Sequence, residues 1–324
     1  MTAHTDDRYY VPHGSHWPVV GSVGLLFLMV GVSSWLNGAS TGFYIMLAGF
    51  GVIIFMLAGW FGTVISESVG GLYNDQVDKS FRQGMFWFIF SEVMFFAAFF
   101  GALFYARNMS IPWLGGDSNN FFTNMLLWPG FESTWPTNGP GNVGGEYEAM
   151  PPFGLPLINT ALLLSSSVTI TIAHHALIAG KRAQLTAFLA MTFILGFIFV
   201  YLQGVEYIEA YEHMNLKLTS GIYGSTFFML TGFHGMHVTI GAIMLTVIWF
   251  RVLKGHFSPE HHFGFEAVAW YWLSGSACTY SSTGCRQHEL LTGANPAQEV
   301  GCDKENNKGG GQGHPYSQCT QQLR

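Results

Sequence analysis

The chain has 324 residues, of which 49% are hydrophobic, 16% aromatic and only 10% charged. Ordinary soluble domains carry about 25% charged residues, so this composition indicates a membrane protein. The 13 Lys and Arg residues form no basic cluster, which argues against nucleic-acid binding.

Six apolar runs in the sequence are long enough to cross a bilayer as helices, which takes about 20 residues. The predicted spans are 17–36, 41–65, 85–106, 155–178, 185–205 and 223–250. A seventh apolar run begins near Phe263 and stops after Trp272, too short to cross. We therefore predict an all-α membrane bundle with six complete spans and an incomplete seventh helix over residues 1–272, and a separate tail over 273–324.

The distribution of Lys and Arg around these spans predicts their orientation, because cytoplasmic loops are enriched in both residues. An N-terminus in the cytoplasm places seven of them on the cytoplasmic side and only two on the other. The seven are Arg8, Lys79, Arg82, Lys181, Arg182, Arg251 and Lys254, and the two are Arg107 and Lys217.

Two connections stand out among the predicted loops. The connection 107–154 is rich in Gly, Pro, Asn and Trp, and we expect an ordered or partly ordered flap on the far side of the membrane. The cytoplasmic link 66–83 is polar, and we expect a loop with a short helix there.

Glu92 is the one acidic residue within the Phe-rich run 86–105. From a helix start at residue 85 it lies roughly 10 Å along the helix, inside the hydrocarbon layer. A carboxylate there costs a few kcal/mol unless it is protonated or partnered. We therefore expect Glu92 to face protein, a lipid headgroup or water. An interhelical hydrogen bond and a proton or ion path both remain open.

Further polar residues gather on the later spans. His234 and His237 share one helix face, as do Glu206 and Glu209. The others are His174, His175, His261, His262 and Glu266. Such residues on facing helices can form a metal or haem site, but they can equally form hydrogen bonds between helices.

Four stretches resemble the cytochrome c oxidase subunit III family. They are 221–238 (GIYGSTFFMLTGFHGMHV), 256–272 (HFSPEHHFGFEAVAWYW), 91–96 (SEVMFF) and 16–18 (HWP). The resemblance covers about residues 10–272, and the long connection 107–154 resembles bacterial members more than mitochondrial ones.

This resemblance implies a seven-helix subunit whose first two helices lean away from the other five, leaving a V-shaped cleft filled with phospholipid. It implies a non-catalytic subunit of the aerobic respiratory oxidase, which supports proton uptake and turnover stability of subunit I. The implied partners are subunit I, subunit II, a small subunit IV and structural phospholipids. Haem a and copper would lie in the partner subunits, with no cofactor or metal bound by this chain. The implied location is the bacterial inner membrane.

The resemblance also assigns roles to individual residues. Glu92 is similar to the family's carbodiimide-reactive intramembrane carboxyl. Lipid-headgroup roles carry over to Glu67, Arg82, Arg251 and His256. A helix-packing role is implied for His234 and His237, and we place Glu206, Glu209, His261, His262 and Glu266 with them as structural polar residues.

The chain departs from the family after Trp272. The family continues into an apolar helix, whereas residues 273–286 read LSGSACTYSSTGCR and all four cysteines of the chain follow residue 277. Codons that encode this stretch allow another reading frame that spells an apolar helix end and a stop. We therefore hypothesise a shifted frame after residue 272, a disordered tail over 273–324 without a selected fold, a weakened or absent seventh helix, and impaired docking on subunit I.

Two alternative functions to an oxidase subunit of the cytochrome c type also remain open. One is the homologous subunit of a quinol oxidase. The other is a proton or solute transporter that uses Glu92, Glu209 and His234. Transporters usually show paired halves or interrupted helices, and the sequence shows neither.

Overall fold

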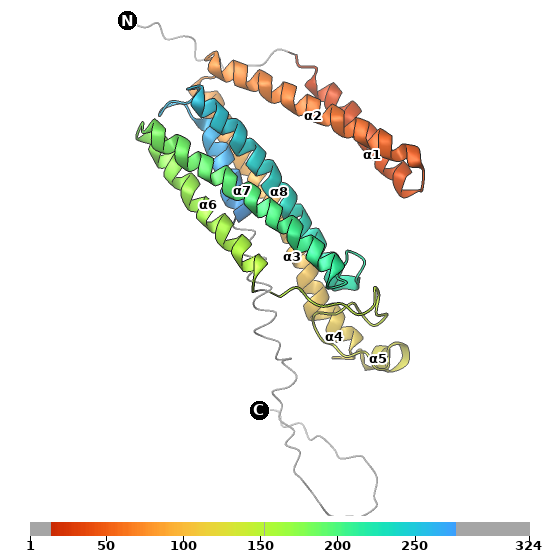
Figure 1. Cartoon of the computed structure of the whole chain (residues 1–324). Helices are drawn as coiled ribbons and strands as arrows, with labels where there is room; N and C mark the ends of the chain where they lie inside the picture. Colours follow the sequence, from red (N-terminus) through yellow and green to blue (C-terminus); the bar gives the residue numbers. More distant parts are fainter. Residues whose placement is uncertain (1–13, 152, 277–324) are drawn as a thin grey trace, which may run out of the picture.

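The computed structural model describes residues 14–151 and 153–276, and all regular structure within them is helical (Figure 1). Six helices are long and apolar enough to cross a membrane. They are α1 (Trp17–Leu36), α2 (Ser40–Val69), α3 (Asp75–Tyr105), α6 (Leu155–Ile178), α7 (Arg182–Glu212) and α8 (Gly221–Leu253). The π-helical turn η1 (Ala106–Ser110) and the short helices α4 (Ile111–Leu114) and α5 (Phe121–Leu127) follow α3.

Each predicted span coincides with one of these helices, and four of the helices are longer than predicted. The largest difference is at α3, which begins ten residues earlier, at Asp75 rather than Met85. The Asn74 side chain accepts a hydrogen bond from the Val77 backbone at 3.0 Å, and acidic residues in the first turn suit the positive end of the helix dipole. Residues 75–83, predicted as part of a polar link, are therefore the first turns of α3.

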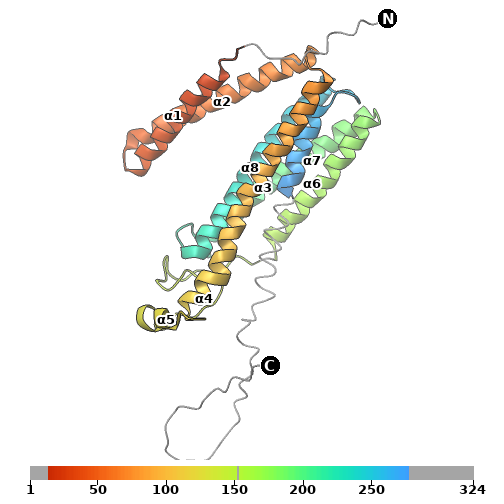
Figure 2. The same cartoon turned by 180° about the vertical axis from the view of Figure 1, so that it is seen from behind.

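Helices α1 and α2 form a pair that is set apart from the other long helices. Figures 1 and 2 show the pair diverging from α6, α7 and α8. The pair lies near the other helices only where α2 ends and α3 begins. The two backbones approach closely at glycines. A Cβ added at Gly31 would overlap the Met46 backbone, and one added at Gly49 would overlap the Leu28 backbone. Small residues permit such close helix packing where no hydrophobic effect drives it.

The second group comprises α3, α6, α7, α8 and a helix over 263–276, at which point the described chain ends. Its core is apolar and includes Leu163, Leu189, Leu245 and Phe265, each 2% exposed or less.

Trp272 fixes the helix 263–276 in this core. Its indole is 3% exposed, and Nε1 donates to the Ser166 hydroxyl of α6 at 3.0 Å. Glycines make room for the ring on both sides, because a Cβ at Gly196 would lie 2.5 Å from Cη2 and a Cβ at Gly241 would lie 2.9 Å from Cε3. One side chain thus joins the last helix to α6, α7 and α8.

A helix is present at the position of the seventh span, so the expectation that it is absent was wrong. Its expected truncation stays a prediction, because the described chain ends at residue 276. The helix is present from residue 263, buries Trp272 and runs at least four residues beyond it. The predicted tail lies outside the described residues from 277 onward.

The long connection 107–154 is ordered, as predicted, over its described residues. It contains η1, α4 and α5, and its later part covers the ends of α7 and α8. There Trp135 and Tyr147 contact Tyr223, with ring centroids 5.7 Å apart in both pairs.

Candidate intramembrane carboxyl site

Glu92 on α3 pairs with His237 on α8. The Glu92 carboxylate oxygen Oε2 lies 2.6 Å from His237 Nε2. His237 Nδ1 lies 2.7 Å from the Phe233 carbonyl oxygen, so Nδ1 carries a hydrogen and donates to it. One further proton must then lie between Nε2 and Oε2, held either as an imidazolium or as a carboxylic acid.

The surroundings of this pair are mostly aromatic. The His237 ring lies edge-on to Phe96, with centroids 5.2 Å apart, and is stacked near Tyr271 at 6.3 Å. The side chains of His237 and Glu92 are 13% and 26% exposed. A low local dielectric strengthens a hydrogen-bonded pair and raises the cost of losing either partner. The intramembrane acid is therefore partnered, which was one of the readings left open by the sequence.

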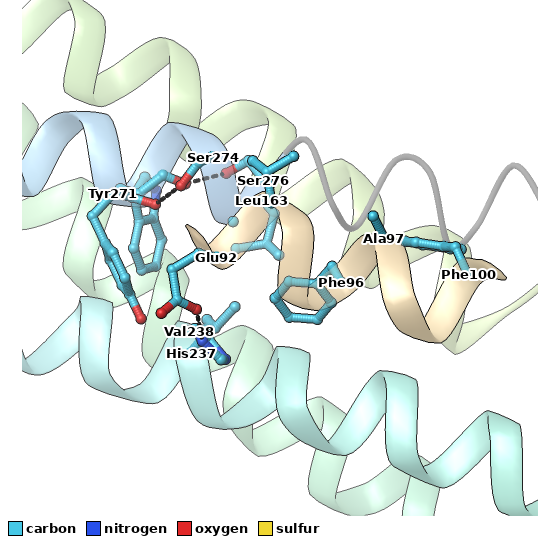
Figure 3. Close-up of a pocket in the computed structure, with 13 residues that line it drawn as sticks. Glu92, Phe96, Ala97, Phe100, Leu163, His237, Val238, Tyr271, Ser274 and Ser276 are labelled. Carbon is cyan, nitrogen blue, oxygen red and sulfur yellow. Dashed lines mark hydrogen bonds and ion pairs between the residues drawn. The ribbon is translucent and has the colours of Figure 1, made fainter. Parts of the chain in front are cut away.

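A cavity of about 300 Å³ opens beside the pair (Figure 3). Helix α3 supplies one wall, α8 the wall with His237, and the helix 263–276 together with Leu163 of α6 the remainder. Most of the lining is apolar, and the polar side chains come from Glu92, His237, Tyr271 and two serines near the end of the described chain. The other lining residues are Val93, Phe96, Ala97, Phe100, Leu163, Val238, Trp272, Ser274, Gly275 and Ser276.

A second polar cluster lies where α3 and the helix 263–276 begin and α6 ends. Arg82 contacts the Asp78 carboxylate at 2.7 Å and also forms an ion pair with Glu266. The other Glu266 oxygen, Oε1, lies 3.2 Å from His262 Nε2 and 3.6 Å from His174 Nε2. Arg82, predicted to contact a lipid headgroup, thus already has two carboxylate partners that would compete with a phosphate.

The other predicted headgroup residues occupy the same end of the helices. Glu67, near the end of α2, accepts a hydrogen bond from the Tyr73 hydroxyl at 2.8 Å. The Arg251 guanidinium lies over the Phe257 ring at 4.4 Å. Within the described chain, Arg251 Nε and His256 Nδ1 are buried without a hydrogen-bond partner.

The remaining predicted residues are separate from the Glu92 site. His234 is 4% exposed, lies edge-on to Phe199 and contacts the Gly275 carbonyl oxygen at 3.2 Å, and its helix-packing role stays a prediction. Glu206 is 1% exposed on α7, Glu209 is half-buried one turn later, and His261 is exposed.

Sequence reasoning did not identify the partners within these clusters. Glu92 and His237 are 145 residues apart, and no local pattern links them. The spacing of His262 and Glu266 at i and i+4 was a usable signal for one contact of the second cluster. That His174 and Arg82 belong to the second cluster could be seen only from the arrangement of the helices.

Comparison with known proteins now identifies the family. The family model for cytochrome c oxidase subunit III matches residues 7–275. The chain belongs to the cytochrome c oxidase subunit III family. Among its relatives, the subunit 3 proteins of Gadus morhua and Formosania lacustris are 39% and 40% identical over 270 and 273 residues. Both matches cover 83% of this chain and 92% of the relative.

A third relative gives the same result. The subunit 3 of Heterololigo bleekeri is 40% identical over 265 residues, covering 82% of this chain and 91% of the relative. As a subunit III, the chain is a multi-pass membrane protein of a terminal oxidase. The family match includes both polar clusters and ends at residue 275.

Proposed function

We propose that this chain is the non-catalytic third subunit of an aerobic cytochrome c oxidase in a bacterial inner membrane, with its N-terminus in the cytoplasm. In this role it packs on subunit I, beside subunit II and a small subunit IV, and supports proton uptake and turnover stability of subunit I. Haem a and copper belong to the partners, and this chain needs no redox centre of its own. The observation that carries the proposal is the family match over residues 7–275.

The Glu92–His237 pair gives the proposed role a physical basis. A proton shared over 2.6 Å within an apolar shell ties α3 to α8 at membrane depth. We propose that this tie keeps the helices in the arrangement that subunit I recognises. Glu92 then has a structural function in the complex, and the adjoining apolar cavity suits a lipid chain or a small apolar molecule.

We further propose that phospholipid headgroups bind near Arg251 and His256. Arg182 donates to the Phe257 carbonyl oxygen at 3.3 Å, so two guanidinium groups flank this loop. A phosphate is a natural bidentate partner for Arg, and the buried Arg251 Nε and His256 Nδ1 are unused in the described chain. Glu67 and Arg82 keep their predicted headgroup role with less support, because Arg82 is engaged by Asp78 and Glu266.

The test is to compare the oxidase complex with and without this subunit. Haem a and copper should co-purify with the tagged chain, and reduced cytochrome c should serve as electron donor. The complex lacking the chain should lose activity faster during turnover. An identical turnover lifetime would contradict the stabilising role. Activity with a quinol but not with cytochrome c would assign the chain to a quinol oxidase instead.

A further inference from the structure

We propose that His174, His262 and Glu266 form a binding site for a divalent transition-metal ion, best suited to Zn²⁺. The proposal departs from the expectation that this chain binds no metal, and it does not depend on the oxidase function. The three residues come from the last turns of α6, from the loop before the final helix and from the first turn of that helix. Figure 2 shows these ends on the same side of the bundle.

The two separations from the Glu266 carboxylate to the histidine nitrogens are close to those of tetrahedral coordination. One atom from each residue lies within 4.8 Å of the other two. Zinc bound to nitrogen and oxygen at about 2.0–2.2 Å requires ligand atoms about 3.3–3.6 Å apart in a tetrahedron. Glu266 Oε1 lies 3.2 Å from His262 Nε2 and 3.6 Å from His174 Nε2. Two histidines and one carboxylate leave a fourth position for water, a ligand set that zinc adopts in proteins.

The hydrogen bonding of His262 favours the form that binds metal. Its Nδ1 lies 3.2 Å from the Ser258 carbonyl oxygen and therefore carries a hydrogen. In the neutral ring, Nε2 then has a free lone pair directed at the Glu266 carboxylate. Two acceptors that face each other require a cation between them, either a proton held by the ring or by the carboxyl group, or a metal ion. An outer hydrogen bond of this kind typically fixes the tautomer of metal-binding histidines.

His174 supplies the second observation. Its Nε2 is buried and has no hydrogen-bond partner among the described residues, although it lies 3.6 Å from Glu266. The ring itself is 28% exposed, which leaves a route from solvent to the cluster. A buried imidazole nitrogen without a partner is costly unless a ligand binds it.

The charges nearby permit a metal ion but limit its affinity. Arg82 occupies the other oxygen of Glu266, and its charge is shared with Asp78. The local charge without metal is therefore one guanidinium against two carboxylates, so a divalent ion is not excluded by repulsion. When bound, the ion would link α6 directly to the start of the helix 263–276. Arg82 would hold the same carboxylate from α3.

The test uses the full chain in lipid–detergent micelles, with its four cysteines replaced by serine to remove other soft ligands. After chelator treatment we expect one Co²⁺ per chain with the visible absorption of a four-coordinate site, displaced by Zn²⁺. His174→Gln or His262→Gln should weaken binding by more than about 100-fold, because losing even an outer-shell partner costs about 10- to 100-fold. The matched controls His175→Gln and His261→Gln remove adjacent histidines outside the cluster and should bind normally.

Equal Co²⁺ binding by the wild-type chain and both cluster variants would overturn the proposal and favour an imidazolium at His262. A second measurement needs no variant: diffraction from the zinc-soaked wild-type protein, recorded at the zinc absorption edge. A peak between the three side chains is the expected result, and the absence of a peak there would also overturn the proposal.

Discussion

Replacing Trp272 with alanine should strongly destabilise the helix bundle. The indole is 3% exposed and contacts three other helices. Removing a buried Trp typically costs about 3–5 kcal/mol, mainly through the cavity that remains. Its hydrogen bond to Ser166 should account for only about 0.6 kcal/mol, the average for such bonds in a membrane protein. Ser166→Ala should therefore cost far less than Trp272→Ala.

Gly196 provides a reciprocal test of the same packing. Gly196→Ala places a Cβ 2.5 Å from the Trp272 ring and should cost about 1–3 kcal/mol. In the Trp272→Ala background the added methyl group has space, so the cost should largely vanish. Gly204→Ala is the matched control, because a Cβ at that position of α7 meets nothing within 4 Å.

The assay is reversible unfolding of the purified chain in mixed micelles titrated with SDS, and the quantity compared is the free energy of unfolding. If Trp272→Ala lowered it by less than about 1 kcal/mol, the cavity argument would fail. Additive effects of Gly196→Ala and Trp272→Ala would show that the two residues do not touch, since contacting residues are coupled.

Four further predictions concern the Glu92–His237 pair, the α1–α2 pair, Tyr147 and the residues after Trp272. His237→Phe should cost about 1.5–3 kcal/mol in the free energy of unfolding by leaving Glu92 unpaired. The double variant Glu92→Met and His237→Phe replaces both partners with apolar groups, so an equal loss from the double variant would argue against the pairing. Gly49→Val should lower the thermal stability of the α1–α2 pair and Gly51→Val should not, because only a Cβ at Gly49 meets the facing backbone. Burial raises the pKa of Tyr147, so folding stability should fall as pH rises above about 10, and Tyr147→Phe should remove that part of the alkaline loss in pH-dependent melting curves. Resequencing the gene across the codon for residue 272 should reveal a shifted frame; recurrence of the tail 273–324 in close relatives would refute the frameshift hypothesis.

The apolar runs were sufficient to locate the six long helices, because membrane length and composition are local properties of the sequence. Helix ends were less predictable. The first turns of α3 are polar, and their helical state depends on the Asn74 cap and on packing of Val77, which is 3% exposed. Hydropathy alone contains neither piece of information.

The functional residues were also only partly predictable from the sequence. Glu92 could be singled out from the sequence because a carboxylate in an apolar run is energetically costly. Its partner, His237, could be identified only from the arrangement of α3 against α8. The resemblance identified His262 and Glu266 as part of a motif without indicating that His174 and Arg82 complete their cluster. The packing of the last helix within the bundle was also not predicted, because the apolar run ends at Trp272 and hydropathy does not show that this side chain contacts three other helices.

The most direct test of the central claim is affinity purification of the tagged full-length chain from its native membranes, followed by haem and metal analysis. Haem a and copper should co-purify in stoichiometric amounts with an oxidase that accepts electrons from cytochrome c. Isolation of the folded chain without haem or copper would contradict its assignment as a working third subunit.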